Sequence, residues 1–290
     1  MNLVKEKEIN HGVKGVSVVI PYFNGSAFIE EAIVSALSSL TANDEIVIVD
    51  DGSEASDHKY LIDFLDRLNN PIIRFLKHES NRGGGAARNT AVRNSSKNWI
   101  FNLDSDNVLP IGLIHQLLDF AIAQNVDVAC PETIHFFKKD TSQITHDWVF
   151  ADRQIETLDH LSSPYVPSAS GNYLFSKAAY EKAGGFPEFG FLDTWGFGLR
   201  MVATGAKMRP CPSTFYFHRF GHESYYIRGG KNIREMSLWA TSLILENSGK
   251  FDSKLIRALL SRKHRYIWYS LLQNNPFKIK ASPSGEVRKY

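Results

Sequence analysis

The first half of the chain alternates short apolar runs with longer stretches in which apolar residues recur every three or four positions. Short runs rich in β-branched residues are typical of buried parallel strands, and the periodic stretches are typical of amphipathic helices. Such alternation predicts an α/β domain with a mostly parallel central sheet flanked by helices. The predicted strands are residues 16–22, 45–49, 72–76, 99–103 and 126–129, and the predicted helices are residues 26–40, 57–68, 83–94 and 111–124.

The second half has a less regular pattern. Its apolar spacing predicts short strands at residues 133–138 and 215–218, and short helices at 177–183 and 193–204 that end at glycines. A helical pattern follows from about residue 232 to 273, with a break near 247–250. The last segment, residues 274–290, contains prolines, serines and scattered charge, and is predicted to be a loose tail.

Composition excludes several classes of protein. The chain has 290 residues, of which 43% are hydrophobic and 22% charged, so a disordered, collagen-like or coiled-coil chain is excluded. Its formal net charge of +2 gives no support to nucleic-acid binding. Two distant cysteines, Cys130 and Cys211, indicate a reducing compartment. No apolar run is long enough to span a bilayer, so we expect a soluble cytoplasmic protein.

Two aspartates one residue apart, Asp104 and Asp106, directly follow the predicted strand 99–103. An Asp-x-Asp at a strand end can direct carboxylate oxygens to one point, and hard divalent cations prefer such ligands. A cation held in this way can bridge a diphosphate. A loop that caps the next helix is the alternative, because Asp favours turns.

A second acidic pair, Asp50 and Asp51, follows the predicted strand 45–49. A carboxylate here can accept a hydrogen bond from a nucleobase N–H or a ribose hydroxyl. No G-x-G-x-x-G follows the first strand, so an NAD-binding Rossmann domain is not favoured. The alternative is a helix N-cap with a turn.

Three consecutive glycines, residues 83–85, open a predicted helix that contains Arg88. Glycines permit close backbone approach, and a helix N-terminus favours anions. Arg88 can add a charged contact to phosphate. No Gly-Lys-Ser/Thr follows, so the segment is not a P-loop. A flexible loop whose helix packs on the sheet explains the same residues.

Together these segments resemble the inverting glycosyltransferases of family 2, which have the GT-A (nucleotide-diphospho-sugar transferase) fold. The matching segments are VSVVIPYFN (16–24), IVIVDDGS (46–53), NRGGGAARN (81–89) and NLDSDN (102–107), within a resemblance that extends from residue 15 to about 222.

The resemblance also implies a domain organisation. It gives an N-terminal extension (1–14), a GT-A catalytic domain (15–228), C-terminal helices (229–273) and the tail (274–290). Residues 15–107 would form the nucleotide-binding half of the catalytic domain, and residues 108–228 the acceptor-binding half.

The resemblance further implies a set of donor-binding residues. Arg88 would lie near the diphosphate. Asp104 and Asp106 match the family's Asp-x-Asp, with Asp106 as the expected direct ligand of Mn²⁺ or Mg²⁺. Asp51 would contact the base. The residues that match the nucleoside-binding segments are Pro21, Tyr22, Asn24, Asp50 and Asp51.

On the acceptor side, family members have a small-residue strand and a Gly-Gly-Phe-x-Glu segment, which residues 168–172 (with Gly171) and 184–188 (with Gly185) match. An acidic pair follows in the family, and its second acid is the general base. Here the pair is reduced to Asp193. Either Asp193 is the base and Leu192 replaces the first acid, or Asp193 is the first acid and Thr194 occupies the base position. Asp193 is the expected base, since no other carboxylate is available; a helix cap is the alternative.

Family members also often place a metal- or diphosphate-contacting histidine at the end of a later strand. His218 matches this position, and His222 is a competitor four residues later. A structural role is the alternative for either histidine. The Gln-x-x-Arg-Trp motif of processive members is absent, so transfer of a single sugar is expected.

A basic amphipathic pattern at residues 254–267 has two interpretations. It can dock peripherally on the inner face of an anionic membrane, where lipid-linked acceptors lie. It can also be a helix that packs on the catalytic domain with a solvated basic face, which we favour.

The expected function is therefore an inverting, metal-dependent, non-processive glycosyltransferase. It would move one sugar from a nucleoside-diphosphate sugar, expected to be a UDP-sugar, to a hydroxyl of a saccharide, lipid-linked or other acceptor in bacterial-type cell-surface polysaccharide or glycoconjugate synthesis. One alternative is a catalytically degenerate glycosyltransferase-like binding module, which the single acid at residue 193 supports. The other is a sugar-phosphate nucleotidyltransferase, whose glycine-rich start with a basic residue is missing.

Overall fold

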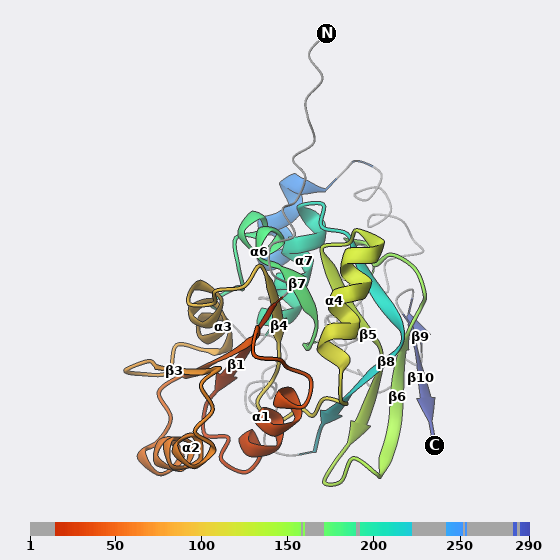
Figure 1. The fold of residues 1–290 in the computed structure, drawn as a ribbon. Helices are drawn as coiled ribbons and strands as arrows, with labels where there is room; N and C mark the ends of the chain where they lie inside the picture. The colour runs from red at the N-terminus through yellow and green to blue at the C-terminus, as the bar shows by residue number, and fades with distance from the viewer. Residues whose placement is uncertain are drawn as a thin grey trace.

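The computed structural model describes residues 15–157, 159, 171–189, 192–221, 242–251, 253, 281–282 and 285–290. Strands and helices alternate through the first half of the chain, as predicted (Figure 1). The elements of this half are β1 (Val16–Tyr22), α1 (Ile29–Leu37), β2 (Glu45–Asp50), α2 (Ala55–Leu68), β3 (Ile73–Lys77), α3 (Gly84–Arg93), β4 (Trp99–Asn102) and α4 (Leu113–Gln124).

The second half adds strands to the same sheet, and its described part includes helices at residues 177–183 and 193–203 that lie close to one another. Its elements are β5 (Val128–Phe137), β6 (Ile144–Phe150), β7 (Leu174–Ser176), α6 (Lys177–Ala183), α7 (Asp193–Ala203), β8 (Met208–Arg219), the 3₁₀ turn η1 (Ser248–Lys250), β9 (Ala281–Ser282) and β10 (Gly285–Lys289).

The strands lie in the order β3-β2-β1-β4-β7-β5-β6-β10-β9, and β8 pairs with β5. The pairs β1–β2, β2–β3, β1–β4 and β5–β8 are parallel, whereas β7, β6 and β10 run antiparallel to their neighbours. The α/β class with flanking helices is confirmed, but the sheet is mixed rather than mostly parallel. One physical reason is that a short loop joins β5 directly to β6, and such a hairpin is antiparallel.

The core is built on β1, which lies between β2 and β4. Val18 and Val19 point to opposite faces of the sheet, and both are fully buried. Helix α3 packs on β1 and β2, while α4 lies across β5 and β8 (Figure 1). A strand covered on both faces requires a continuous apolar run, which explains the sequence of residues 16–20.

Strands β5 and β8 are longer than the sequence pattern predicts. β5 joins the two predicted strands 126–129 and 133–138, and β8 extends the predicted strand 215–218 back to Met208. Prolines interrupt both segments, and the β5–β8 register shifts between Pro131 and Thr133. Because proline cannot donate to a ladder, these prolines gave a false indication of strand ends.

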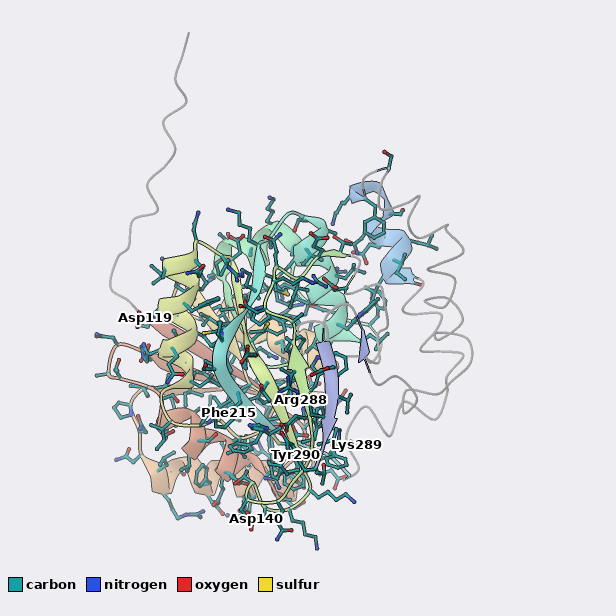
Figure 2. The ribbon with its side chains drawn as sticks, turned by 90° about the vertical axis from the view of Figure 1, so that its right-hand side faces the viewer. Asp119, Asp140, Phe215, Arg288, Lys289 and Tyr290 are labelled. Carbon is teal, nitrogen blue, oxygen red and sulfur yellow. The ribbon has the colours of Figure 1, made fainter. Side chains whose placement is uncertain are left out.

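The C-terminal end is not the loose tail that the sequence predicts. Residues 285–289 form β10, which pairs antiparallel with β6, and the Tyr290 hydroxyl donates to the Asp147 carboxylate. Figure 2 shows Arg288, Lys289 and Tyr290 along this strand. Charged residues are common on strands near a sheet edge, where they face solvent and discourage further pairing, so scattered charge did not exclude a strand.

Several predicted segments lie outside the described residues. These are the extension 1–14, the basic pattern 254–267 and most of the predicted C-terminal helices. None of the helices in the described part of the chain combines the length and the apolar composition that crossing a bilayer requires.

Candidate active site

The carboxyl ends of β1, β2 and β4 meet at one edge of the sheet, because these strands are parallel neighbours. Tyr22 is in register with Asp50, and the Asp51 N–H donates to the Tyr22 carbonyl at 2.8 Å. Asp104 follows the end of β4 by two residues. The structure therefore brings the predicted nucleoside segments and the Asp-x-Asp to the same edge.

Tyr22 is a buried end residue of β1, next to the half-buried Pro21. Its hydroxyl donates to the Asp57 carbonyl at 3.0 Å. Burial raises the pKa of Tyr22, and the nearby carboxylates of Asp57 and Asp50 raise it further. The phenol therefore stays protonated and acts as a donor.

Asp50 joins the loops that follow β1 and β2. Its carboxylate is fully buried, accepts the Ser53 N–H at 2.9 Å and lies 2.7 Å from His58 Nδ1. Asn24, in the left-handed region at φ 48°, donates its N–H to Ser53 Oγ at 3.0 Å. The Asn24 side-chain oxygen accepts the Glu54 N–H at 2.8 Å. These hydrogen bonds fix the two loops relative to each other.

Asp51 holds the glycine-rich loop in place. Oδ1 accepts the Arg82 N–H at 3.0 Å and lies 2.6 Å from His78 Nδ1, while Oδ2 accepts the Gly83 N–H at 2.8 Å. The other ring nitrogen of His78 lies 2.9 Å from Thr90 Oγ1 on α3. The buried Asp51 thus connects the end of β2 to the first turn of α3.

Arg88 is the centre of the site. It is buried on α3, and its Nε donates to Asn102 Oδ1 at 2.9 Å. One terminal nitrogen lies 2.5 Å from Asp104 Oδ1 and the other 2.5 Å from Asp193 Oδ2. A single guanidinium therefore holds the first acid of the Asp-x-Asp and the predicted base, which are 89 positions apart in sequence.

The other carboxylate oxygen of Asp104 faces two amides. Asn172 Nδ2 lies 3.3 Å from Oδ2 and Asn107 Nδ2 lies 3.4 Å from it. The same Asn107 nitrogen is 3.4 Å from His218 Nδ1, so His218 lies on the Asp104 side of the site. Burial raises the pKa of Asp104 against the opposing effect of Arg88, and the neighbouring Asp106 carboxylate raises it further.

The donor set suits Mn²⁺ or Mg²⁺. Two adjacent carboxylates that repel each other favour a cation between them, and both metals accept one or two carboxylates together with phosphate oxygens and water. No group of three or more His, Cys, Asp or Glu that could hold a metal by itself occurs in the described part of the chain. A metal here would need further ligands from water or from a bound molecule.

Asp193 is the first residue of α7 and is 9% exposed. Its Oδ1 accepts the Thr194 N–H at 3.0 Å. A methyl group built on Gly84 would lie 2.8 Å from Asp193 Oδ2, so the carboxylate is packed against the first turn of α3. It therefore lies at the positive ends of two helices, which stabilises its negative charge.

The two glycines predicted for the acceptor side have different surroundings. A methyl group built on Gly171 would lie 2.7 Å from Asp104 Oδ2, so Gly171 adjoins the site directly. Gly185, at φ 76°, approaches Asn89, which also bonds the backbone of Phe186. Gly185 therefore serves loop packing beside α3. His222 lies outside the described residues.

The sequence did not predict several residues of this region as site residues, namely His58, His78, Asn102, Asn107, Asn172 and Arg219. Asn102 stands inside the matched segment NLDSDN and could have been found as the residue just before the acidic loop. His58 and His78 had no signal, because their role is to contact buried carboxylates across long sequence separations. Arg219 directly follows the predicted His218, but it stands in no motif that would mark it.

Comparison with known sequences places these features in a family. The family described as Glycosyl transferase family 2 matches residues 17–184, more than half of the chain. Chondroitin synthase of Escherichia coli is 35% identical over 118 residues, 41% of this chain and 17% of the relative. The Escherichia coli UDP-Glc:alpha-D-GlcNAc-diphosphoundecaprenol beta-1,3-glucosyltransferase WfgD is 29% identical over 111 residues, 38% of this chain and 42% of the relative. The chain thus spans less than half the length of either relative.

Solved structures share the fold. S. aureus TarS 1-349 in complex with UDP-GlcNAc has a TM-score of 0.61 at 16% identity, over 89% of this chain and 80% of that one. The mannosyltransferase PcManGT from Pyrobaculum calidifontis, in complex with GDP-Man and Mn²⁺, has a TM-score of 0.58 at 13% identity, over 88% and 83%. The fold is the GT-A fold of these structures, and by the sequence match the chain belongs to glycosyltransferase family 2.

Proposed function

We propose that this chain is an inverting, metal-dependent glycosyltransferase that transfers one sugar from a nucleoside-diphosphate sugar to an acceptor hydroxyl. The observation that carries the proposal is the Arg88 contact with both Asp104 and Asp193 at 2.5 Å. A group that binds the donor diphosphate and a group that accepts a proton must lie on two sides of one anomeric carbon. The shared guanidinium supports such an arrangement.

In the proposed donor site, the nucleoside binds at the ends of β1 and β2. Pro21, Tyr22 and Asn24 form one side, and Asp50 and Asp51 the other. Asp51 Oδ2 accepts one hydrogen bond, from Gly83, among the described residues, which leaves capacity for a base N–H. The UDP-GlcNAc complex of TarS and the UDP-Glc donor that the name of WfgD gives support a UDP-sugar.

The diphosphate would lie beside Asp104, Asp106 and His218. Asp106 is the proposed direct ligand of Mn²⁺ or Mg²⁺. Asp104 and His218 would contact the metal or the diphosphate once the donor is bound, and the diphosphate and water would supply the remaining ligands. A metal bound there would stabilise the negative charge that develops on the leaving diphosphate. The PcManGT complex with GDP-Man and Mn²⁺ supports this cofactor class.

Asp193 is the proposed general base. Its Oδ1 accepts one N–H from its own helix and can accept a proton through the remaining lone pair. The acceptor oxygen forms its bond to the anomeric carbon while the bond to the diphosphate breaks on the opposite face. The acceptor proton moves to Asp193, and the configuration inverts because no covalent intermediate forms. A positioned base contributes about 10²–10⁴-fold in rate.

The proposed acceptor is a saccharide, lipid-linked or other hydroxyl compound of bacterial cell-surface synthesis. WfgD, whose name gives a diphosphoundecaprenol-linked GlcNAc as its acceptor, supports the lipid-linked case.

Ligand-dependent stability tests the donor site. UDP with Mn²⁺ at 100 times its Kd should raise the free energy of unfolding by about 2.7 kcal/mol, seen as a higher Tm. UDP with EDTA should raise it less. If no nucleoside diphosphate raises Tm with any divalent ion, the proposal fails.

Product analysis separates the alternative functions. A glycosyltransferase releases nucleoside diphosphate from its donor, and a nucleotidyltransferase releases pyrophosphate. A degenerate binding module would bind UDP with Mn²⁺ and release neither product from any nucleotide-sugar in a mixed panel.

A further inference from the structure

Arg219, the last residue of β8, contacts the acidic loop directly. Its N–H donates to Asn107 Oδ1 at 3.0 Å, and its Nε donates to the Asp106 carbonyl at 3.0 Å. Asn107 in turn faces both Asp104 and His218 at 3.4 Å. Arg219 therefore bonds the backbone carbonyl of Asp106, the proposed metal ligand. It also bonds the side-chain amide of Asn107, which lies between Asp104 and His218.

The rest of the guanidinium joins two other parts of the fold. One terminal nitrogen lies 3.4 Å from the carbonyls of Lys138 and Lys139 in the β5–β6 hairpin. The other pairs with Glu31 on α1. The acidic loop is thereby tied to two elements that belong to opposite halves of the chain.

The Arg219 side chain is also fixed from its faces. The guanidinium carbon lies 4.8 Å from the centre of the Phe28 ring and 4.4 Å from that of Phe137. Cation–π contacts of this kind stabilise a guanidinium most when water is excluded, and the residue is only 5% exposed. The hydrogen bonds hold the guanidinium at its edge, and the two rings cover its faces.

From these contacts we propose that Arg219 is a positioning residue that holds Asp106 in the orientation required for metal binding. The inference rests on the proposed function, because the metal belongs to the donor site. Arg219 contacts the loop after β1 at the Phe28 ring, but it makes no hydrogen bond to the loops after β1 and β2 in the described structure. Its loss should therefore weaken metal binding and leave recognition of the nucleoside largely intact.

Lysine cannot reproduce this role. A planar guanidinium donates in several fixed directions, whereas one ammonium cannot reach the Asp106 carbonyl, the hairpin carbonyls and Glu31 together. Arg219→Lys keeps the charge and much of the volume, so it tests the geometry of the fork. Glu31→Gln is a milder second variant, because it removes only the negative charge of the half-exposed Glu31 partner.

Arg200→Lys is the matched control. Arg200 is also largely buried, donates to the Gly185 carbonyl at 2.9 Å and pairs with Glu246 at 2.8 Å. It makes no described contact with the acidic loop. The control reports what the same substitution does to a buried arginine that has no link to the proposed metal site.

The experiment measures two affinities for each full-length variant. Mn²⁺ affinity is measured by electron paramagnetic resonance with saturating UDP, and UDP affinity is measured by NMR in EDTA. Changing an outer partner of a metal site typically costs 10–100-fold in metal affinity, and we expect about this loss for Arg219→Lys. UDP affinity in EDTA should change by less than about threefold, Glu31→Gln should show a smaller loss of Mn²⁺ affinity, and Arg200→Lys none.

Unchanged Mn²⁺ affinity in a folded Arg219→Lys variant would overturn the inference, as would an equal loss of both affinities. If Arg219→Lys does not fold, Glu31→Gln decides, and an unchanged Mn²⁺ affinity there rejects the positioning role. If the wild-type protein binds UDP but Mn²⁺ adds nothing, or if it binds neither, the proposed function fails before the variants are compared.

Discussion

At the scale of single residues, the charge on Arg88 depends on its neighbours. Burial alone acts to lower the pKa of a guanidinium, but the carboxylates of Asp193 and Asp104 outweigh this effect and raise it. Each carboxylate gains a partner that it would otherwise lack in a largely buried position. The three side chains therefore form one electrostatic unit, and removing its centre leaves two negative charges close together.

This unit gives a prediction for stability. Arg88→Gln should lower the free energy of unfolding by about 3–5 kcal/mol, because it leaves buried carboxylates without their cation. Arg82→Gln is the control: Arg82 is exposed and lies 3.5 Å from Glu188, so its loss should cost about 0–1 kcal/mol. Urea unfolding at pH 7 measures both. If Arg88→Gln lowers the free energy of unfolding no more than Arg82→Gln does, the three side chains do not form one electrostatic unit.

A second prediction separates the two registers of the acidic segment. If Asp193 is the base, Asp193→Asn should bind UDP with Mn²⁺ like the wild type and lose about 10²–10⁴-fold in transfer rate. The amide still accepts a hydrogen bond from Arg88, so the fold is retained. Thr194→Val should keep its activity, since the Thr194 hydroxyl has no proposed role. Transfer assays under saturating donor measure both, and near-wild-type turnover of Asp193→Asn would reject the base.

At the scale of elements, the close approach of α3 to the loop before α7 positions the site. A methyl group built on Gly85 would lie 1.8 Å from the Pro187 carbonyl oxygen and 3.2 Å from Asp193 Cβ. The helix that carries Arg88 can reach Asp193 only because residue 85 has no side chain. The glycines that sequence analysis assigned to phosphate approach therefore also allow the two segments to pack.

Gly85→Ala should accordingly lower the free energy of unfolding by about 3 kcal/mol or more, because backbone atoms would have to move. Gly184→Ala is the matched control. Gly184 has φ 79°, but a methyl group there meets nothing within 4 Å, so only backbone strain of about 1–2 kcal/mol is expected. Thermal unfolding monitored by circular dichroism compares them. A larger loss at Gly184 than at Gly85 would contradict the packing argument.

The sequence predicted elements best where one local pattern decided them. The strand at 16–22 and the helix ending at residue 68 have clear periodicity, and β1 and α2 match them closely. The local pattern did not predict strands whose existence or length depends on distant segments. β10 forms because β6 offers it an edge, and β8 continues through prolines because β5 pairs with it. The same distinction holds in the site. Asp104 and Asp106 stand in a motif, whereas the contacts of His78 and Arg219 require the folded chain.

At the scale of the whole molecule, both cysteines report on opening of the fold. Cys130 lies in β5 and is fully buried, and Cys211 lies in β8 and is 6% exposed. Burial raises the pKa of each thiol, so less thiolate is present near neutral pH than in an exposed cysteine. Since the thiolate is the reactive form, both thiols should react slowly for two reasons: burial keeps the reagent away, and little thiolate is present.

The native protein at pH 8 should therefore react slowly with a disulfide reagent such as DTNB, and two thiols per chain should react rapidly in urea. Labelling of Cys130 requires β5 to separate from the elements packed around it, so it should follow the population of the open state. UDP with Mn²⁺ should slow this labelling by a factor of 1 + [L]/Kd, because the ligand binds only the closed fold.

A Cys211→Ser variant isolates the Cys130 rate, and UDP in EDTA shows how much of the protection needs the metal. Rapid labelling of Cys130 in the folded protein, unaffected by UDP and Mn²⁺, would mean that β5 opens independently of the donor site. That result would contradict the argument that Arg88 and Arg219 join the two halves of the sheet.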